Sequence, residues 1–283
     1  MNTAAVKHSN RIRHDRIFPT INTIFLILLM FITLYPVINT VAYSFNDGTD
    51  ALRGNIGLWP RVFSLESYRS ILSDKAVYQA AWISASKTVI ITLLNLFWTS
   101  MLAYTLSRKE FVLRRFITVI MVLTMYVNAG LIPNYLLISK TLHLSNSYLV
   151  YIIPTMFSCF NMIVIRTYIA GLPEALVESA KIDGAGALQR ILRVILPLIT
   201  PQINFCVIYA AITSLNGSYM FVELLTKGGP GNASEVLGTY MKTVGYNYHQ
   251  FGYATAVSMM ILVVTAVMSV VLNKLFRADA YEY

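Results

Sequence analysis

Polar residues that interrupt apolar stretches are the ones that could do chemistry in this chain of 283 residues, and the longest interruption runs from Glu174 to Pro197. It carries six charges, namely Glu174, Glu178, Lys181, Asp183, Arg190 and Arg193. Each charge would cost about 2.5–3.5 kcal/mol at the centre of a bilayer. We therefore expect this segment to lie at a membrane surface or against a partner rather than to cross a membrane.

A turn divides this segment into two expected helices. Pro173 suits the first turn of a helix and Gly184 suits the position just past a helix end, which predicts a first helix of about ten residues. After the turn that ends at Gly186, apolar residues recur at helical spacing with polar residues on the opposite face. They are Leu188, Ile191, Leu192 and Ile195. The spacing predicts a second amphipathic helix that ends at Pro197. A connecting loop that happens to be helical is the alternative interpretation.

A second candidate set lies in a later apolar run, where Asn216, Tyr219 and Glu223 share one helix face. Polar residues within apolar spans normally face a bundle interior or an aqueous pathway. Hydrogen-bonding groups beside an aromatic ring suit a sugar, and Gly217 permits close approach or a kink. The pattern favours a substrate pathway. Hydrogen bonding between helices is the alternative, as it is for Asn95, Asn128, Asn161 and Asn204.

Signals for other chemistry are weak in this sequence. No Gly-Lys-Ser or Gly-Lys-Thr follows Gly228–Gly231, so that stretch is expected to be a turn rather than a phosphate loop. Cys159 and Cys206 lie within apolar runs and are expected to be small core residues. The histidines show no paired ligand spacing, so no metal site is expected; they are His8, His14, His143 and His249. No nucleophile, metal set or acid–base pair lies in the apolar runs, and we do not expect an enzyme.

The elements that must position these residues are membrane spans. The chain is 56% hydrophobic and only 12% charged, against roughly 25% charged residues in soluble proteins, which indicates an integral membrane protein. Six apolar runs can each supply the roughly 20 residues that a spanning helix needs. Their approximate bounds are 17–45, 82–106, 116–138, 148–169, 199–225 and 253–276. We predict an all-α fold in which residues 17–277 form a six-span membrane domain between tails at 1–16 and 278–283.

The distribution of Lys and Arg predicts the orientation of these spans. Six crossings place both termini on one side, and that side holds more Lys and Arg than the other, although Lys87 near the second span belongs to neither. By the positive-inside rule, both termini and the Glu174 helix are expected to be cytoplasmic. The net charge of +9 is spread in short clusters beside the spans, so it indicates topology rather than nucleic-acid binding.

Three ordered pieces of the polar segment resemble a known motif: Glu178-Ser-Ala, Asp183-Gly-Ala and Ile195-Leu-Pro197. Their order and spacing resemble the EAA loop of ABC importer permeases, the cytoplasmic helix pair that docks into the ATPase subunit. Ser179 replaces the usual first Ala of that motif. The resemblance implies that the docking residues are Glu174, Glu178, Ser179, Ala180, Asp183, Gly184, Ala185 and Pro197.

Other stretches resemble the carbohydrate-uptake branch of these permeases, the group that serves oligosaccharides. They are Gly54–Pro60, Gly130–Tyr135 and Arg166–Pro173. The stretch Thr226–Glu235 looks instead like the Gly-Gly-Pro loop of the partner permease in the same family. Both of the paralogous permease roles therefore stay open.

The resemblance implies a type I ABC importer permease of a bacterial cell membrane. Such a chain pairs with a second, homologous permease and with two ATP-binding cassette subunits, and it receives an oligosaccharide from an external sugar-binding protein. ATP and Mg would bind to the ATPase subunits, because this chain lacks a Walker motif and needs no cofactor of its own. The rivals are an ion- or proton-coupled secondary transporter and an intramembrane enzyme. A coupled transporter usually shows ionisable residues at membrane depth and paired repeats, and Glu223 is the one candidate.

Overall fold

The computed structural model describes residues 3–127, 129–144, 147–229 and 231–275, with side chains from residue 18 onward except those of 216, 218 and 275. Within this part of the chain, regular structure is helical apart from one isolated bridge between Asn46 and Phe63. The all-α prediction is confirmed. The chain forms two compact units: residues up to 73 together with 244–259, and residues 74–243 together with those from 260 onward.

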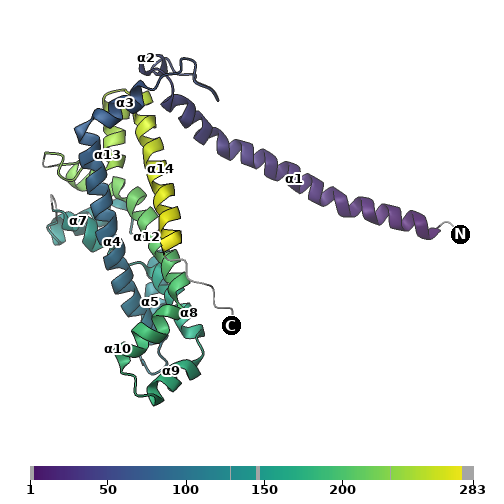
Figure 1. Ribbon diagram of the computed structural model, residues 1–283, viewed down its shortest axis with the longest axis vertical. Coiled ribbons are helices and arrows are strands. Elements are labelled where there is room, and N and C mark those ends of the chain that lie inside the picture. The colour runs from purple at the N-terminus through teal and green to yellow at the C-terminus, as the bar shows by residue number, and fades with distance from the viewer. Residues whose placement is uncertain (1–2, 128, 145–146, 230, 276–283) are drawn as a thin grey trace. The chain divides into compact units, whose positions relative to one another are not determined.

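The first unit is dominated by α1 (Thr3–Ser44), which begins well before the predicted span and so includes the basic N-terminal segment (Figure 1). Residues 18–37 of α1 are exposed on every side although most of them are apolar. A helix that is apolar all round and unburied suits contact with lipid or with another membrane helix. The unit also contains α2 (Gly48–Ala51), α3 (Glu66–Ser73) and the first turns of α14 (Phe251–Leu275).

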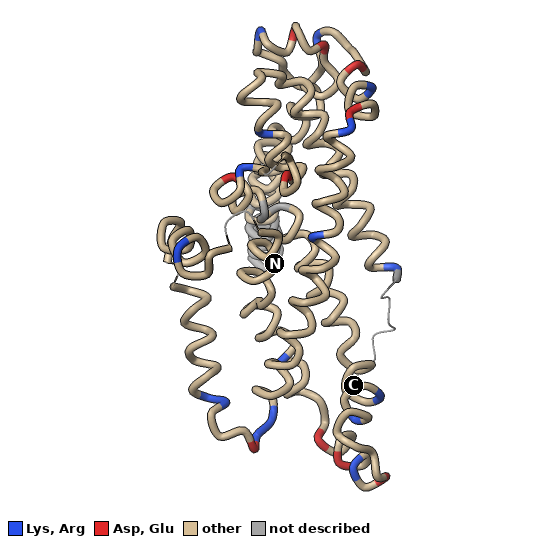
Figure 2. Tube along the Cα trace, turned by 90° about the vertical axis from the view of Figure 1, so that its left-hand side faces the viewer, with Lys and Arg blue, Asp and Glu red and all other residues tan. Residues whose placement is uncertain are grey.

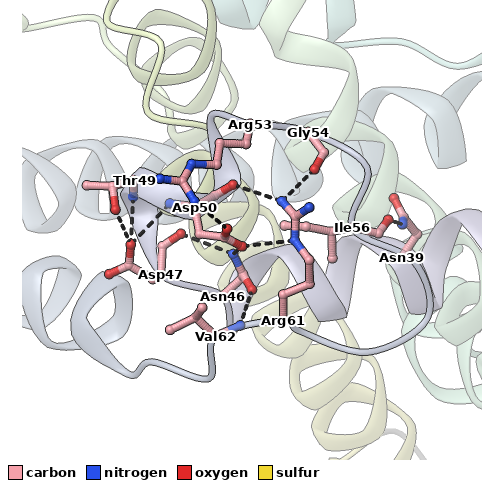
Figure 3. A network of polar contacts seen from close by, with 10 residues as sticks. All are labelled: Asn39, Asn46, Asp47, Thr49, Asp50, Arg53, Gly54, Ile56, Arg61 and Val62. Atoms are coloured by element: carbon pink, nitrogen blue, oxygen red, sulfur yellow. Dashed lines mark hydrogen bonds and ion pairs between the residues drawn. The ribbon is translucent and has the colours of Figure 1, made fainter.

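Polar side chains organise the loop that follows α1 (Figure 3). Asn46 is fully buried; its Nδ2 donates to Asp50 Oδ2 at 2.9 Å and its Oδ1 accepts from the Val62 N–H at 3.0 Å. Arg61 donates to the same Asp50 oxygen and to the Gly54 carbonyl. The hydrogen bond from Asn46, and to a smaller extent that from Arg61, lower the pKa of Asp50 because they stabilise its charged form. The loop is therefore held by its own side chains.

The second unit is built around α4 (Lys75–Ser107), which begins where the Asp74 side chain accepts a bond from the Ala76 N–H. α4 packs against α8 (Cys159–Gly171) and α12 (Thr200–Phe221), and it runs from α13 (Leu237–Lys242) at one end of the unit to the turn before α5 at the other (Figure 1). Its main apolar core lies near that turn and includes Ala103, Leu106, Met162, Ile165, Ile195, Ile199 and Cys206.

Two of the predicted spans are bent rather than straight. α5 (Arg114–Tyr126) meets α6 (Leu131–Leu136) and the π-helical η1 (Leu137–Thr141) at 113°, after Gly130 at φ +83°. α7 (Leu149–Ile152) with η2 (Ile153–Thr155) meets α8 at 44°, where Ser158 caps the new helix by accepting from the Asn161 N–H. In the described residues, four unbroken helices can span a membrane, and counting each bent pair as one span gives the predicted six.

Candidate functional site

The polar segment folds into the predicted helix, α9 (Glu174–Ile182), followed by a tight turn. Gly184 has φ +80°, which confirms its predicted left-handed conformation. The Gly184 N–H donates to the Lys181 carbonyl at 3.1 Å, and the Ala185 N–H donates to the Ala180 carbonyl at 2.9 Å. This pair of bonds is a Schellman motif, which satisfies the last carbonyls of a helix and sets the direction of the next one.

The second helix ends one residue after its predicted end. It consists of α10 (Ala187–Arg190), the π-helical η3 (Ile191–Ile195) and α11 (Leu196–Leu198), so the prediction of a helix that ends at Pro197 is confirmed to within one residue. Pro197 falls in the first turn of α11, directly after the wide π turn. Its missing N–H costs little at such a position. After the break at Ile199 the chain enters α12.

The side chains of this segment are largely exposed. The predicted docking residues are all exposed except Ala180 and Ala185, which are half-buried. Glu174 forms an ion pair with Lys109 in the turn after α4, and this hydrogen bond and charge lower the pKa of Glu174, with a smaller contribution from Arg108. Within the described part of the chain, Glu178 has no ion-pair partner. The ion pair ties α9 to the α4–α5 turn and leaves Glu178 available.

Apolar side chains are exposed beside these charges. Ile182 is 81% exposed and Leu188 is 69% exposed, and Leu192 is half-exposed on the next turn. Charged residues of both signs gather at the same end of the second unit (Figure 2), where a hollow of about 650 Å³ lies beside α9. Exposed apolar residues with a charged rim are typical of a docking surface for another protein.

Inside the second unit, one face of α4 is polar and buried. Its residues follow the spacing of one helix face, and they are Ser84, Lys87, Thr88, Thr92, Asn95 and Thr99. This polar face of α4 bonds to several neighbours: the Leu237 N–H donates to Ser84 Oγ at 3.1 Å, and Asn95 Nδ2 donates to the Thr155 carbonyl at 3.0 Å. Asn161 Nδ2 completes the set by donating to Asn95 Oδ1 at 3.2 Å.

A partly open cavity of about 140 Å³ lies beside the polar face of α4. Polar and aromatic residues make up most of its lining, and they include Asn95, Tyr151, Thr155, Ser158, Asn161, Tyr209, Thr213 and Ser214. Gly217 also lines the cavity, and no atom lies within 4 Å of the position that its Cβ would take. α12 continues unbroken through Gly217, so there is no break at this glycine, and the π-helical η4 (Val222–Thr226) begins only after Phe221.

The three residues of the predicted pathway stripe are not brought together at this cavity. Glu223 forms an ion pair with Lys242 of α13, and Tyr219 lies against Gly238 of the same helix. The Asn216 side chain is outside the described part of the chain, as is Asn128. Asn204 pairs with Asn273 on α14. The stripe therefore stays a prediction, while Asn95 and Asn161 are the predicted polar residues that line the cavity.

Lys87 is the residue that sequence reasoning missed. It lies near the middle of α4 and is fully buried, so naming Glu223 as the one ionisable residue at membrane depth was wrong. Its Nζ donates to the Ser214 carbonyl of α12 at 2.8 Å and lies 5.8 Å from the centre of the Tyr151 ring. The signal was available: Lys87 falls inside the predicted second span, between Ser84 and Asn95 on a face of Ser, Thr and Asn at helical spacing.

The two cysteines lie in or against the apolar core. Cys206 is buried in the apolar core and Cys159 is half-buried with its Sγ 2.9 Å from the Met121 carbonyl, so the prediction of core cysteines is confirmed. Across the described residues, His, Cys, Asp and Glu do not gather in a group that could hold a metal ion.

Curated proteins similar to this chain are permeases of bacterial transport systems. The polygalacturonan/rhamnogalacturonan transport system permease protein YtcP of Bacillus subtilis (strain 168) is 34% identical over 206 residues, which cover 73% of this chain and 71% of YtcP. The arabinooligosaccharides transport system permease protein AraQ of Halalkalibacterium halodurans is 27% identical over 235 residues, which cover 80% of this chain and 82% of AraQ.

Solved structures show the same fold. A bacterial ABC transporter involved in the import of the acidic polysaccharide alginate contains a chain that matches with a TM-score of 0.79 and 25% identity, covering 94% of this chain and 98% of that one. A second structure, of the alginate ABC transporter in complex with an alginate pentasaccharide-bound periplasmic protein, has a TM-score of 0.63 at 19% identity, covers 99% of both chains and supports the fold alone.

The family described as "Binding-protein-dependent transport system inner membrane component" matches residues 95–278, which include α8 through α14 and most of the cavity lining. Together with the long match to YtcP, this shows that the chain belongs to that family, the membrane permeases of ABC importers.

Proposed function

We propose that this chain forms half of the translocation pathway of an ATP-driven, binding-protein-dependent importer of an oligosaccharide. Support for the substrate class comes from the relatives, which are named for polygalacturonan or rhamnogalacturonan and for arabinooligosaccharides, and from the alginate importer, which shares the fold. The cavity beside the polar face of α4 agrees with it, since amides, hydroxyls and aromatic rings are the groups that bind sugars.

The partners follow from the proposed function. A second, homologous permease would supply the other half of the pathway, two ATP-binding cassette subunits would bind ATP and Mg, and an extracellular sugar-binding protein would deliver the substrate. The whole assembly would lie in the lipid of a bacterial cell membrane with both termini of this chain in the cytoplasm.

The observation that carries the coupling role is the exposed surface of α9 and the helix after it. Ile182, Leu188 and Glu178 are presented on a short helix pair whose turn is set by a Schellman motif. A carboxylate such as that of Glu178 accepts strong, charge-assisted bonds from a basic residue of a partner. Closure of the ATPases would then move α9, and the spans would rock between inward-facing and outward-facing states.

The test compares Glu178→Ala with Glu66→Ala, a matched loss of one exposed carboxylate from α3, in the complete importer reconstituted in liposomes. A hydrogen bond to a charged group contributes about 1.5–3 kcal/mol, so Glu178→Ala should reduce sugar uptake and its coupling to ATP hydrolysis by roughly tenfold or more. Glu66→Ala should behave as wild type. Normal coupling in Glu178→Ala would contradict the docking role.

The same liposomes separate the importer from the rival transporter. Uptake by an ABC importer should stop when ATP is omitted from the lumen and should continue when a protonophore removes the proton gradient. The opposite pattern would show a proton-coupled transporter and would contradict the proposed function.

A further inference from the structure

Lys87 is a buried amine without a carboxylate beside it. Its side chain has no exposed surface, and among the residues that the structure describes no carboxylate lies within ion-pair distance of it. A charge at membrane depth is costly, and buried charges in proteins are normally paired. An ionisable residue within a membrane span commonly marks a substrate pathway or a ligand site. The groups around Lys87 therefore indicate what it could bind.

The residues that contact Lys87 also line the cavity beside the polar face of α4. The Ser214 carbonyl accepts from Lys87 Nζ and the Tyr151 ring lies 5.8 Å away, and both residues line the cavity. An ammonium group carries three donors, and the described contacts occupy one of them. The Tyr151 hydroxyl donates to the Ser234 carbonyl, so this ring is fixed in place. The Lys87 amine therefore lies immediately behind the cavity wall.

The rest of the lining contributes hydrogen-bonding groups but no compensating charge. No Asp or Glu is among the lining residues that the structure describes. Asn161 is 1% exposed and its Oδ1 has no partner in the described part of the chain, although its Nδ2 bonds to Asn95. An unpaired buried acceptor suits a ligand hydroxyl. The Tyr209 ring lies at the same cavity and provides an aromatic surface.

We propose that this cavity selects oligosaccharides that carry carboxylates, such as those built from uronic acids, and that Lys87 is the residue that determines this selectivity. The inference rests on the proposed function and names its substrate class. A charge in a surrounding of low dielectric attracts an anion far more strongly than the same charge in water. A neutral sugar of the same shape would gain the hydroxyl contacts but not the attraction to Lys87.

The experiment uses the complete importer in liposomes with its binding protein and ATP, and two probes that differ in their carboxylates: a trisaccharide of galacturonic acid and the corresponding trisaccharide of galactose. We expect wild-type importer to take up the acidic probe about tenfold faster or more. This first comparison requires no mutation, so it does not depend on whether a variant folds.

The second comparison asks whether Lys87 causes the preference. Lys87→Met, which keeps the length of the apolar stem, should slow uptake of the acidic probe by about tenfold or more while uptake of the neutral probe changes by about twofold or less. Lys87→Arg keeps the charge and should keep the preference. The matched control is Lys140→Met, which removes the same charge from an exposed position on η1.

The outcomes distinguish a failure of the inference about Lys87 from a failure of the proposed function. ATP-driven uptake of the neutral probe without a preference for the acidic one would overturn the inference and leave the proposed function standing. An equal loss for both probes in Lys87→Met would show that Lys87 only positions α12, which also overturns the inference. Uptake that does not require ATP would overturn the proposed function itself.

Discussion

Gly184 and Gly186 differ in backbone conformation although they are two residues apart in one turn. Gly184 has φ +80°, whereas Gly186 has φ −62° and ψ 164°, a conformation open to any residue. No atom lies within 4 Å of an added Cβ at either position, so space does not distinguish them. A side chain at Gly184 would cost roughly 1–2 kcal/mol because of its left-handed backbone, and a side chain at Gly186 would cost little.

We therefore expect Gly184→Val to disturb the Schellman motif and to redirect the helix that follows α9, while Gly186→Val leaves it in place. In detergent, the Gly184 variant should keep the partner permease but lose the ATPase subunits, as measured by co-purification. The Gly186 variant should retain both. If the two variants retain the ATPases equally well, the turn does not set the docking geometry.

The contrast between Gly184 and Lys87 shows which residues could be read from the sequence. Both ends of α9 are determined by residues that are adjacent in the chain. The position of Pro173 was therefore enough to predict its start, and that of Gly184 its end. The burial of Lys87 depends on a carbonyl of Ser214 and a ring of Tyr151, which the fold brings from far along the chain. Hydropathy marks Lys87 as an exception within a span, but it does not say what the side chain meets there.

At the scale of elements, the loop between α1 and α3 depends on Asn46. This side chain donates to Asp50, accepts from the Val62 N–H and is fully buried. Asn46→Ala should leave the buried Val62 N–H without its acceptor and Asp50 with its arginine partners alone, at a cost of about 1–3 kcal/mol. We expect the loop to open more often, so that trypsin cleaves after Arg53 and Arg61 faster than in wild type, as followed by mass spectrometry.

The control for this prediction is Thr49→Ala. Thr49 is exposed and bonds only to the neighbouring Asp47 carboxylate among the described contacts of its side chain. Its loss should leave the cleavage rate near that of wild type. Equal cleavage rates in wild type and Asn46→Ala would mean that the network around Asp50 does not hold the loop.

Element type was easier to predict than element shape. Apolar runs of about 20 residues located the spans, because length and hydropathy are properties of the run itself. The bends are not such properties: one follows the unusual backbone of Gly130 and the other follows η2 and the cap at Ser158.

At the scale of the whole molecule, the bent pair of α5 and α6 decides the topology. If the pair crosses the membrane, Glu110 before α5 and Lys140 in η1 lie on opposite sides; if it turns back, they lie on the same side. We expect a crossing, since six crossings place α9 in the cytoplasm with both termini. In a cysteine-free background, made by Cys159→Ser and Cys206→Ala, Lys140→Cys should react with an impermeant maleimide in intact cells.

The companion variant completes the topology test. Glu110→Cys should react only after the membrane is permeabilised, and both positions are exposed, so burial would not mask the label. Labelling of both cysteines in intact cells, or of neither, would show a re-entrant pair and would reverse the predicted side of every element between α6 and the C-terminus.

The polar face of α4 also limits how this permease can move. Ser84, Lys87 and Asn95 bond to α13, α12 and η2, while Thr99 accepts from the Ser158 N–H at the start of α8. A rotation of α4 by one residue, about 100°, would break all of these bonds together. We expect α4, α8 and α12 to move together as one rigid body, without rotation of α4 about its own axis. A movement of α9 with the ATPase subunits would then move the cavity wall as one piece. The cavity would keep its shape while its opening changes from one side of the membrane to the other.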